Sequence, residues 1–406
     1  MRTYFILAWR NIWRNKRRAM ITIASVYFAV IFALAMRSMQ LGSYDNMEKN
    51  IVGMFNGYIQ VQDTAYWKNR SINHSLRYDN SLQHILRSDR NVSGLVPRLE
   101  SFALASSGEL TKGVMVIGID PGPEDLLTQL AARVNQGNYL TPTDEGVLLG
   151  EKLAAYLQLS VNDTLVLIGQ GYHGVSAAGK FPVRGLVHYP NPDMSGQMVV
   201  MSLSQAQYFL AIEGRVTSIV LDVRDRAMAG ETAASLDSGL PPGLTAMDWK
   251  TMLPELVQAI ESDNASGKIM LGILYMVIGF GILGTVIMMT AERRREMGVM
   301  VAVGLQRWKL ALITALETLT LALIGVAAGV VTAIPLLEYL HRHPVPATGE
   351  MKEMIEEYGM EAVLVFSRDP ALYRDQALIV ALIALTTLAY PVVSILLLKP
   401  IRALRH

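Results

Sequence analysis

The sequence predicts a membrane protein with four transmembrane helices and a large α+β extracytoplasmic domain inserted between helices 1 and 2. The mean hydropathy of +0.29 is too high for an ordinary soluble protein, and a charged fraction of 17% is too high for a chain buried wholly in lipid. Apolar segments at 19–40, 267–291, 310–337 and 377–398 are long enough to cross a bilayer. The loops between them differ in charge, and this difference predicts their orientation.

The N-terminal segment, residues 1–18, is expected to form a cytoplasmic amphipathic elbow helix. It holds six lysines and arginines and no acidic residue. Phe5, Trp9, Ile12 and Trp13 fall on one helical face, so tryptophans lie beside basic residues. This composition is typical of a helix that lies in the headgroup region of a membrane.

The first span is predicted at 19–40. The run from Ala19 to Met36 carries no charge and reaches roughly 27 Å as a helix, close to the thickness of the hydrocarbon core. A cleavable signal peptide is the alternative, because Ala33-Leu34-Ala35 imitates a cleavage site. The apolar run is longer than such peptides use, so we favour a retained transmembrane helix.

The stretch 41–266 is polar enough to form a soluble domain, and we expect an α+β unit in two lobes on the outer side of the membrane. Short β-like and helical patterns follow one another along it, and a helix from Met247 to Lys268 is expected to lead back to the membrane. The β-like stretches are 58–62, 112–119, 164–168, 181–187, 197–202 and 217–223, and the helical ones are 120–134, 151–157 and 204–211.

The remaining spans carry features that predict how they pack. The second span, 267–291, contains several glycines, and the third, 310–337, contains Gly325-Val-Ala-Ala-Gly329. Two small residues four apart let another helix approach closely. The fourth span, 377–398, contains Pro391, which is expected to kink the helix.

Loop charges give one consistent orientation. The loop 292–309 holds five basic and two acidic residues, whereas 338–376 holds eight acidic and four basic ones. The tail 399–406 is again basic. By the positive-inside rule, both termini and 292–309 are cytoplasmic, while 41–266 and the loop 338–376 lie outside. The protein is therefore expected in the inner (plasma) membrane.

The cytoplasmic loop 292–309 is the candidate functional element. Met297, Met300, Val301 and Gly304 follow the i, i+3, i+4, i+7 spacing of one helical face, and the arginines 293–295 are expected to stay in water. Such a short amphipathic piece suits a contact with something outside the membrane. A plain stop-transfer loop anchored by its arginines is the alternative.

Motifs for intrinsic chemistry are weak. The segment 174–180 has the glycine and lysine spacing of a phosphate-binding loop, but Phe181 stands where a Mg²⁺-binding Ser or Thr belongs, so a flexible surface loop between two strands is expected. The histidines of 341–343 lack metal-site spacing, and a solvated pair is expected. The chain has no cysteine and a net charge of +1. We predict no catalytic residue, metal site, bound cofactor or nucleic-acid partner.

Glu317 is the one acid well inside a predicted span. A proton or substrate contact is one interpretation of a carboxylate at that depth, and a helix–helix hydrogen bond is the other. The second interpretation is favoured, because nothing else in the spans suggests an ion pathway.

Three stretches resemble FtsX-like and MacB-like ABC transporter permeases. They are the elbow Leu7–Arg18, the loop Glu292–Gly304, and the C-terminal Tyr390–Arg405 with its Lys399-Pro-Ile-Arg-Ala-Leu-Arg405 ending. One span, a large outer domain and three further spans is also the topology of that family, so the resemblance covers nearly the whole chain.

The outer domain is most similar to that of the lipoprotein-releasing permeases LolC and LolE. The similarity rests on Ile117-Gly-Ile-Asp-Pro121, Gly150-Glu-Lys-Leu-Ala154 and Met201-Ser-Leu-Ser-Gln-Ala206 in that order. The outer loop 338–376 departs from the pattern because it is longer than expected in LolC or LolE.

The resemblance implies an ATP-driven permease that extracts lipoproteins from the inner membrane and passes them to a periplasmic carrier. Its partners would be two ABC ATPase subunits that bind ATP and Mg²⁺, a second permease copy (identical or a sister chain), the carrier and membrane lipid. Efflux of drugs, peptides or other amphiphiles, and signalling to a cell-wall hydrolase, are the alternatives. An intrinsic enzyme is the least favoured reading.

Three groups of residues carry these roles. The ATPase-coupling group is Glu292, Arg293, Arg294, Arg295, Glu296, Met297, Gly298, Met300 and Gly304. The apolar substrate cleft is lined by Phe32, Met36, Met39, Ile273, Leu274 and Val277, where flexible methionines suit mixed acyl chains. The carrier-contact loop contributes Gln170, Tyr172, His173 and Lys180.

Overall fold

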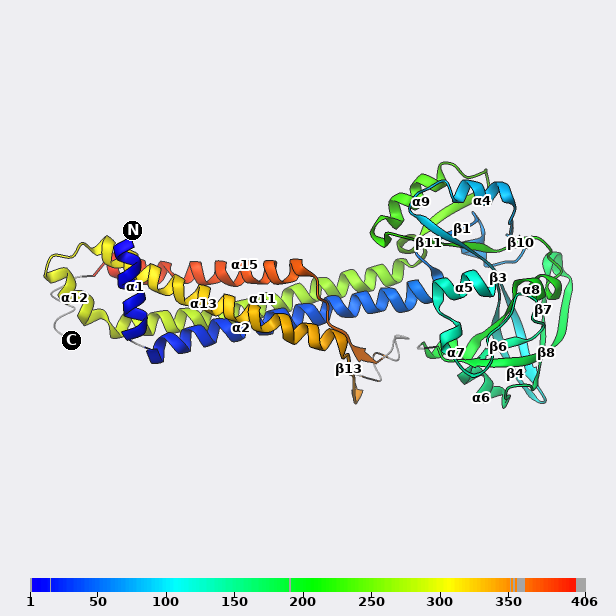
Figure 1. Cartoon of the computed structure of the whole chain (residues 1–406), viewed down its shortest axis with the longest axis horizontal. Coiled ribbons are helices and arrows are strands. Elements are labelled where there is room, and N and C mark those ends of the chain that lie inside the picture. Colours follow the sequence, from blue (N-terminus) through cyan, green and yellow to red (C-terminus); the bar gives the residue numbers. More distant parts are fainter. Residues whose placement is uncertain are drawn as a thin grey trace. The chain divides into compact units, whose positions relative to one another are not determined.

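A computed structural model describes residues 2–14, 16–189, 191–350, 352, 355 and 362–398. The chain divides into two compact units (Figure 1). The helical unit comprises Met1–Asp45, Ile260–Pro346 and Leu364–His406, and the sheet unit comprises Asn46–Ala259 and Ala347–Val363. The predicted tail 399–406 lies outside the described residues.

Seven helices lie in the described part of the helical unit. They are α1 (Arg2–Arg14), α2 (Lys16–Glu48), α11 (Pro254–Glu292), α12 (Arg294–Ala302), α13 (Arg307–Arg342), α15 (Pro370–Thr387) and α16 (Ala389–Leu396). In the described part of the chain, four segments are long and apolar enough to cross a membrane: Ala19–Gly53, Pro254–Glu292, Arg307–Arg342 and Pro370–Leu396. The prediction of four spans, with a sheet domain inserted after the first, is confirmed.

The third span packs closely against the first. A Cβ added at Gly325 would lie 2.7 Å from the Cβ of Val26, and one added at Gly329 would lie 2.8 Å from the Cβ of Val30. Both valines are fully buried. The small-residue face predicted from the Gly325–Gly329 spacing is therefore confirmed, and its partner is α2 of the same chain.

The fourth span is interrupted close to its proline. Helix α15 ends at Thr387 and α16 begins at Ala389, with Pro391 in its first turn. A proline ring clashes with the carbonyl four residues earlier, here Thr387, and supplies no N–H to bond it. The predicted kink lies at this break.

At one end of the helical unit, the chain before α15 lies along α2. The hydroxyl of Ser38 donates to the carbonyl oxygen of Ser367 at 2.5 Å, and the Ser367 N–H donates to the carbonyl oxygen of Ser38 at 2.9 Å. His341 Nδ1 lies 2.6 Å from the Phe366 carbonyl oxygen. The prediction of a solvated histidine pair is thus wrong for His341, which is half-buried because this carbonyl faces it.

Polar side chains join α2 to α11 at the same end. Arg37 donates to Asn264 Oδ1 at 2.9 Å, and the Tyr44 hydroxyl donates to Asp263 Oδ2 at 2.6 Å. A Cβ added at Gly267 would overlap the end of the Gln40 side chain, so a larger residue there would displace that side chain. These contacts hold the first two spans together where their apolar runs end.

The sheet unit is built on one ten-stranded sheet of order β12-β1-β11-β3-β4-β9-β6-β8-β5, with β7 pairing with β3 and β8. Figure 1 shows the strands in two groups, one around β1 and β11 and one around β4, β6 and β8, with β3 reaching both. The main strands are β1 (Ile59–Asp63), β3 (Val92–Ser107), β4 (Leu110–Ile119), β5 (Val134–Gly137), β6 (Val147–Gly150), β7 (Thr164–Gln170), β8 (Ser176–Val187), β9 (Met198–Ser202), β11 (Ser218–Val223) and β12 (Leu244–Asp248).

Short helices cover this sheet. They are α3 (Tyr66–Asn69), α4 (Asn80–Leu86), α5 (Pro121–Thr128), α6 (Glu151–Leu157), α7 (Pro192–Gln197), α8 (Leu203–Phe209), α9 (Ala229–Asp237) and α10 (Trp249–Met252). The core between sheet and helices includes Leu149, Leu153, Leu157 and Phe181. Minor elements are the π-helix Lys49–Asn56, the 3-10 turns Ala131–Arg133, Tyr172–Gly174 and Arg226–Met228, and the strands β2 (Leu76–Arg77), β10 (Arg215–Val216), β13 (Val345–Pro346) and β14 (Val363–Leu364).

Two predicted helices differ from the structure. The helix expected over 120–134 ends at Thr128, because Gln129 adopts a left-handed conformation (φ 53°) and the chain turns into β5. The helix expected from Met247 begins instead at Pro254. Met247 lies in β12, which pairs with β1, and the Asp248 side chain caps the separate short helix α10 by accepting from the Thr251 N–H.

A buried ion pair lies under the longest strand. Arg98 of β3 donates from Nε to Glu124 Oε2 at 2.8 Å and from Nη2 to Oε1 at 2.6 Å. Both side chains are almost fully buried, and Glu124 raises the pKa of Arg98 against the opposite effect of burial. The two-pronged geometry compensates the cost of removing both charges from water.

Candidate functional site

The hairpin between the second and third spans contains a short helix with a defined end. Helix α11 ends at Glu292, and α12 covers Arg294–Ala302. Gly304 has φ +107°, its N–H donates to the Val301 carbonyl at 3.1 Å, and the Leu305 N–H donates to the Met300 carbonyl at 3.0 Å. This is the glycine-terminated hydrogen-bond pattern that closes many helices. The chain then turns into α13 at Arg307.

One face of α12 is buried inside the chain itself. Met297 is buried in a cluster with Leu310 and Ile395, and Met300 and Val301 pack against the same cluster. The predicted apolar face is confirmed for these three residues. Its inclusion of Gly304 is wrong, because α12 ends at Ala302 and the glycine forms the turn. The face is therefore covered by α13 and α16, and a partner cannot bind to it.

The opposite face of α12 is exposed. Arg294, Arg295 and Glu296 lie on it together with Val299, and Val303 just past the helix end is 83% exposed. Val299 and Val303 were missed by the sequence prediction, although their i, i+4 spacing would have shown a second, narrower apolar face. Exposed apolar groups rimmed by charge are typical of a protein–protein contact.

Arg293 differs from its neighbours. The sequence prediction placed it in water with Arg294 and Arg295, but its side chain is only 9% exposed. Its Nη1 lies 2.9 Å from Glu317 Oε1 and 2.7 Å from Oε2. The prediction is wrong because Arg293 sits at the break between α11 and α12, where the turn directs it toward α13. The Glu317 carboxylate, 5% exposed, is thereby engaged in a helix–helix contact.

The N-terminal helix lies at the same end of the helical unit as α12 (Figure 1). Arg14 of α1 donates to Glu296 of α12 at 2.8 Å, and α1 packs against α13. Trp9 and Trp13 are exposed as expected for an interfacial helix, whereas Ile12 is buried against Leu321. The predicted face is thus divided between exposed tryptophans and a buried isoleucine. The side chain of Phe5 lies outside the described part of the chain.

The predicted cleft residues come from the first two spans. Phe32 of α2 and Val277 of α11 are 61% and 64% exposed on the surface of the helical unit, and Ile273 is also exposed. Met36 and Leu274 are half-buried, and Met39 packs against the cluster that joins the four spans. Phe32 stacks on Phe28, one turn earlier, at 6.4 Å between ring centroids. The role of the six predicted residues as a substrate cleft stays a prediction.

The predicted carrier-contact loop is a β-hairpin tip in the sheet unit. Gln170 ends β7, and Lys180 lies within β8, so the loop proper covers only 171–175. The Tyr172 N–H donates to the Leu210 carbonyl at 2.9 Å, and the His173 N–H donates to Asn73 Oδ1 at 2.8 Å. Gln170, His173 and Lys180 are exposed, and Tyr172 is half-buried. The loop is anchored, which differs from the flexible loop expected over 174–180.

Strand β8 argues against a phosphate-binding loop at residues 174–180. Residues 176–187 form β8, whereas a phosphate-binding loop must lead into a helix whose N–H groups face the phosphate. Gly174, at φ +82°, serves the turn before the strand. The prediction against a nucleotide site rests on the missing Ser or Thr, and the backbone adds this second reason.

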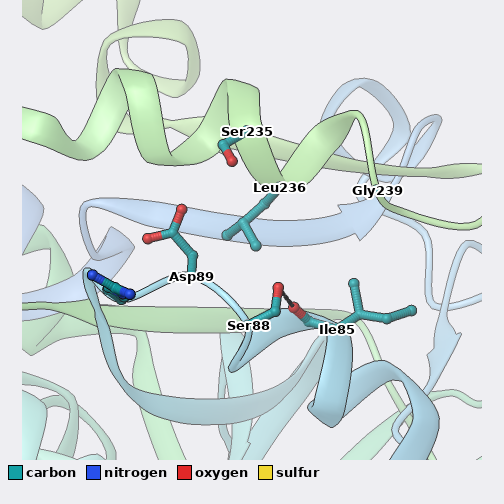
Figure 2. Close-up of a pocket in the computed structure, with 7 residues that line it drawn as sticks. Ile85, Ser88, Asp89, Ser235, Leu236 and Gly239 are labelled. Atoms are coloured by element: carbon teal, nitrogen blue, oxygen red, sulfur yellow. Dashed lines mark hydrogen bonds between the residues drawn. The ribbon is translucent and has the colours of Figure 1, made fainter.

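Other polar groups of the sheet unit are engaged locally. A pocket of about 370 Å³ lies between α4 and α9, where the Ser88 hydroxyl donates to the Ile85 carbonyl at 2.7 Å (Figure 2). Asp89, beside it, accepts from the Asn91 N–H. These bonds serve a turn, and they bring no nucleophile and base together. Among the described residues, no group of three His, Asp or Glu side chains is arranged to hold a metal.

His188 and Glu151 form a histidine–carboxylate pair in the sheet unit. His188 Nδ1 lies 2.9 Å from Glu151 Oε2, and Asn135 donates to Oε1 at 2.7 Å. The hydrogen bond to His188 holds the pKa of Glu151 below its usual range. A carboxylate with a lowered pKa stays ionised at neutral pH and is a poor proton acceptor.

Two family models together match most of the chain. Residues 19–238 match the MacB-like periplasmic core domain, and residues 268–400 match the FtsX-like permease C-terminal domain. The first match alone covers more than half of the sequence. The chain belongs to the FtsX/MacB-type ABC permeases. Membrane helices with a periplasmic-type domain make it a membrane-embedded permease of this family.

Relatives of this permease include proteins named LolC and proteins named MacB. The lipoprotein-releasing system transmembrane protein LolC of Xylella fastidiosa is 24% identical over 262 residues, which is 63% of each chain. LolC of Neisseria meningitidis serogroup B is 23% identical over 329 residues, 78% of this chain and 76% of that one. The macrolide export ATP-binding/permease protein MacB of Brucella abortus is 31% identical over 144 residues, 34% of this chain and 22% of that protein. The permease thus spans about 63% of the Xylella relative's length.

A solved structure is also similar to the permease. The periplasmic region of MacB from Actinobacillus actinomycetemcomitans is matched with a TM-score of 0.36 and 16% identity, covering 52% of this chain and 96% of that region.

Proposed function

We propose that this permease is the transmembrane subunit of an ATP-driven machine that extracts lipoproteins from the inner membrane and passes them to a periplasmic carrier. The observation that carries the proposal is the similarity to proteins named as lipoprotein-releasing, which extends over 262 residues in one relative and 329 in another. Each match is longer than the predicted outer domain 41–266 alone.

In this proposal, the exposed face of α12 receives the ATPase. Two ATPase subunits bind ATP and Mg²⁺, and one docks against Val299, Val303 and the basic rim of Arg294 and Arg295. The buried face of α12 packs on α13 and α16, so a push on α12 moves these helices. Helix α13 in turn meets α2 through Gly325 and its neighbours, and α2 leads toward the sheet unit in sequence.

The cargo explains why ATP is needed. Burial of lipid is worth about 0.8 kcal/mol per methylene, so three acyl chains of about fourteen methylenes each hold a lipoprotein by on the order of 30 kcal/mol. Spontaneous release at that cost is negligible. Exposed Phe32, Ile273 and Val277, with Met36 and Met39 beside them, would receive the chains. A second permease copy would close the cleft, and residues 170–180 would meet the carrier.

Depletion of this permease in its host tests the proposal. Lipoproteins destined for the outer membrane should accumulate in the inner membrane, as measured by fractionation of the two membranes after labelling of the acyl chains. Re-expression of the wild-type chain should restore sorting, and the non-lipidated periplasmic proteins should be unaffected throughout. Normal lipoprotein sorting in a clean depletion contradicts the proposal.

A second candidate is efflux of drugs, peptides or other amphiphiles. It is favoured by the 31% identity to MacB over 144 residues, a higher identity than the LolC relatives show. This function needs an outer-membrane channel as partner. It predicts changed susceptibility to toxic amphiphiles in the depleted strain together with normal lipoprotein sorting, so the same strain separates the two functions.

A further inference from the structure

A buried ion pair lies where the hairpin helix meets the third span. Arg293 and Glu317 are both more than nine-tenths buried, and Arg293 Nη1 contacts both carboxylate oxygens, at 2.9 and 2.7 Å. Arg293 belongs to neither α11 nor α12, because it forms the turn between them. Its side chain therefore connects the hinge of the hairpin to a fixed point in the first third of α13.

The pair extends to the N-terminal helix through one more carboxylate. Glu296 Oε2 lies 3.7 Å from Arg293 Nε and accepts from Arg14 Nη2 at 2.8 Å. Four charged residues therefore form a row of alternating sign that links α13 to α12 and α1: Glu317, Arg293, Glu296 and Arg14. Arg293 Nε has no hydrogen-bond partner in the described part of the chain, although it is buried. A small rotation of α12 would bring Glu296 Oε2, now 3.7 Å away, within hydrogen-bond distance of Arg293 Nε.

Packing alone does not provide this connection. The apolar contacts of α12 are non-directional, and methionines adapt to shifts of their neighbours. An ion pair in a low-dielectric site is directional, and separating it leaves two uncompensated buried charges. A movement of the hairpin hinge should therefore move Glu317, and with it α13, by a similar amount.

We propose that Arg293 and Glu317 are positioning residues that lock the hairpin helix to the third span, so that force received on α12 moves α13 instead of bending the hinge. This inference rests on the proposed function for the origin of that force. The lock itself is a property of the chain and is measurable without any ATPase.

The absence of cysteine makes the measurement direct. A single Val303→Cys change on the exposed end of the hairpin takes a spin label, and its mobility is recorded by electron paramagnetic resonance for the full chain in lipid nanodiscs. Glu317→Gln should raise the label mobility at least about twofold, because it removes one partner of a buried pair. The exchange Arg293→Glu with Glu317→Arg should restore the original spectrum.

A matched control lies at the other end of the same helix. Glu338→Gln also neutralises an α13 glutamate in an ion pair, here with Arg342 at 2.7 Å, and it should leave the label unchanged. Equal mobility in Glu317→Gln and wild type overturns the inference, as does an exchange variant as mobile as Glu317→Gln. If Glu317→Gln does not purify, Arg293→Lys replaces it. Lysine keeps the charge, but its ammonium ends one bond short of the position of Arg293 Nη1, so intermediate mobility is expected and wild-type mobility overturns the inference.

A functional arm separates the two hypotheses. With the cognate ATPase bound, Glu317→Gln should lower transport per ATP hydrolysed about tenfold while the ATPase still binds. Wild type that neither binds an ATPase nor transports overturns the proposed function and leaves the spectroscopic result standing. Wild type that transports, with Glu317→Gln equally coupled, overturns the inference alone.

Discussion

Single glycines determine how closely the first and third spans approach. Gly325 and Gly329 face Val26 and Val30, and a Cβ at either glycine would come within 3.0 Å of a valine carbon. The ideal Cβ at Gly325 would also lie 3.0 Å from the backbone oxygen of Ile23. Backbone cannot yield as a flexible side chain can, so a larger residue must push the helices apart.

Gly329→Val should therefore destabilise the helical unit. Overpacking of a close contact costs about 1–3 kcal/mol, so the melting temperature of the detergent-solubilised chain should fall clearly. The control is Gly281→Val in α11, an exposed position with no heavy atom within 4 Å of its Cβ. A melting temperature for Gly329→Val equal to that of the control would show that this helix contact does not form.

Residue-level prediction from the sequence worked for these glycines and not for Arg293. Spacing alone identifies a close-packing face, since two small residues four apart align on any helix. Arg293 stands in a run of three arginines that look equivalent in the sequence. Only the crossing of α11 and α13 selects which of them meets Glu317, and no local pattern contains that crossing.

At the scale of elements, α12 is an amphipathic helix whose two faces have different tasks. Met297 and Met300 pack inward, while Val299 and Val303 face outward. Gly304 ends the helix through its positive φ, which an L-residue adopts only with strain. A change at Gly304 alters the shape of the hairpin, whereas a change at Val303 alters only its surface.

Val303→Asp should weaken ATPase binding at least about tenfold, because it buries an unpaired charge in the contact. Affinity capture of the ATPase on the full-length chain, repeated over a range of ATPase concentrations, measures the binding affinity. Leu126→Asp, the same kind of change at an exposed site in α5 of the sheet unit, is the control and should bind as wild type does. Gly304→Asp should lose binding too, with a lowered melting temperature that Val303→Asp does not show. Unchanged capture by Val303→Asp would exclude this face as the docking surface.

Sequence-based prediction failed for β3, a strand whose buried charged side chains are paired with distant polar groups. Strand β3 was missed, because Pro97, Arg98 and Glu100 interrupt the alternation that marks a strand. All three are buried, and the two charged side chains have partners: Arg98 bonds Glu124, and Glu100 accepts from the Tyr66 hydroxyl at 2.9 Å. Those partners are distant in sequence, so the pattern could not reveal them. Strands β4, β7 and β11 are largely apolar and were predicted, whereas the short apolar strand β6 was missed.

At the scale of the whole molecule, the two ends of the helical unit hold different segments. Arg14 meets Glu296 at one end, and Ser38 meets Ser367 at the other. In the described part of the chain, the first end holds the basic hairpin 292–309, and the second holds the residues that directly follow α13 and precede α15. The number of spans and the inserted domain followed from hydropathy, because lipid requires long unbroken helices. The prediction that the first end is cytoplasmic rests on the positive-inside rule.

Cysteine labelling in intact cells tests that assignment. The chain has no cysteine, so Leu126→Cys in α5 and Val303→Cys beyond α12 each introduce a single thiol, at positions 88% and 83% exposed. A membrane-impermeant maleimide should label position 126 once the outer membrane is made porous, and should label position 303 only after the inner membrane is broken. Both thiols should react in detergent, which controls for accessibility. Because transferring the sheet unit across the membrane fixes the direction of every later span, labelling of position 303 in unbroken inner membranes would invert the topology, and the ATP-receiving role of α12 would have to be abandoned with it.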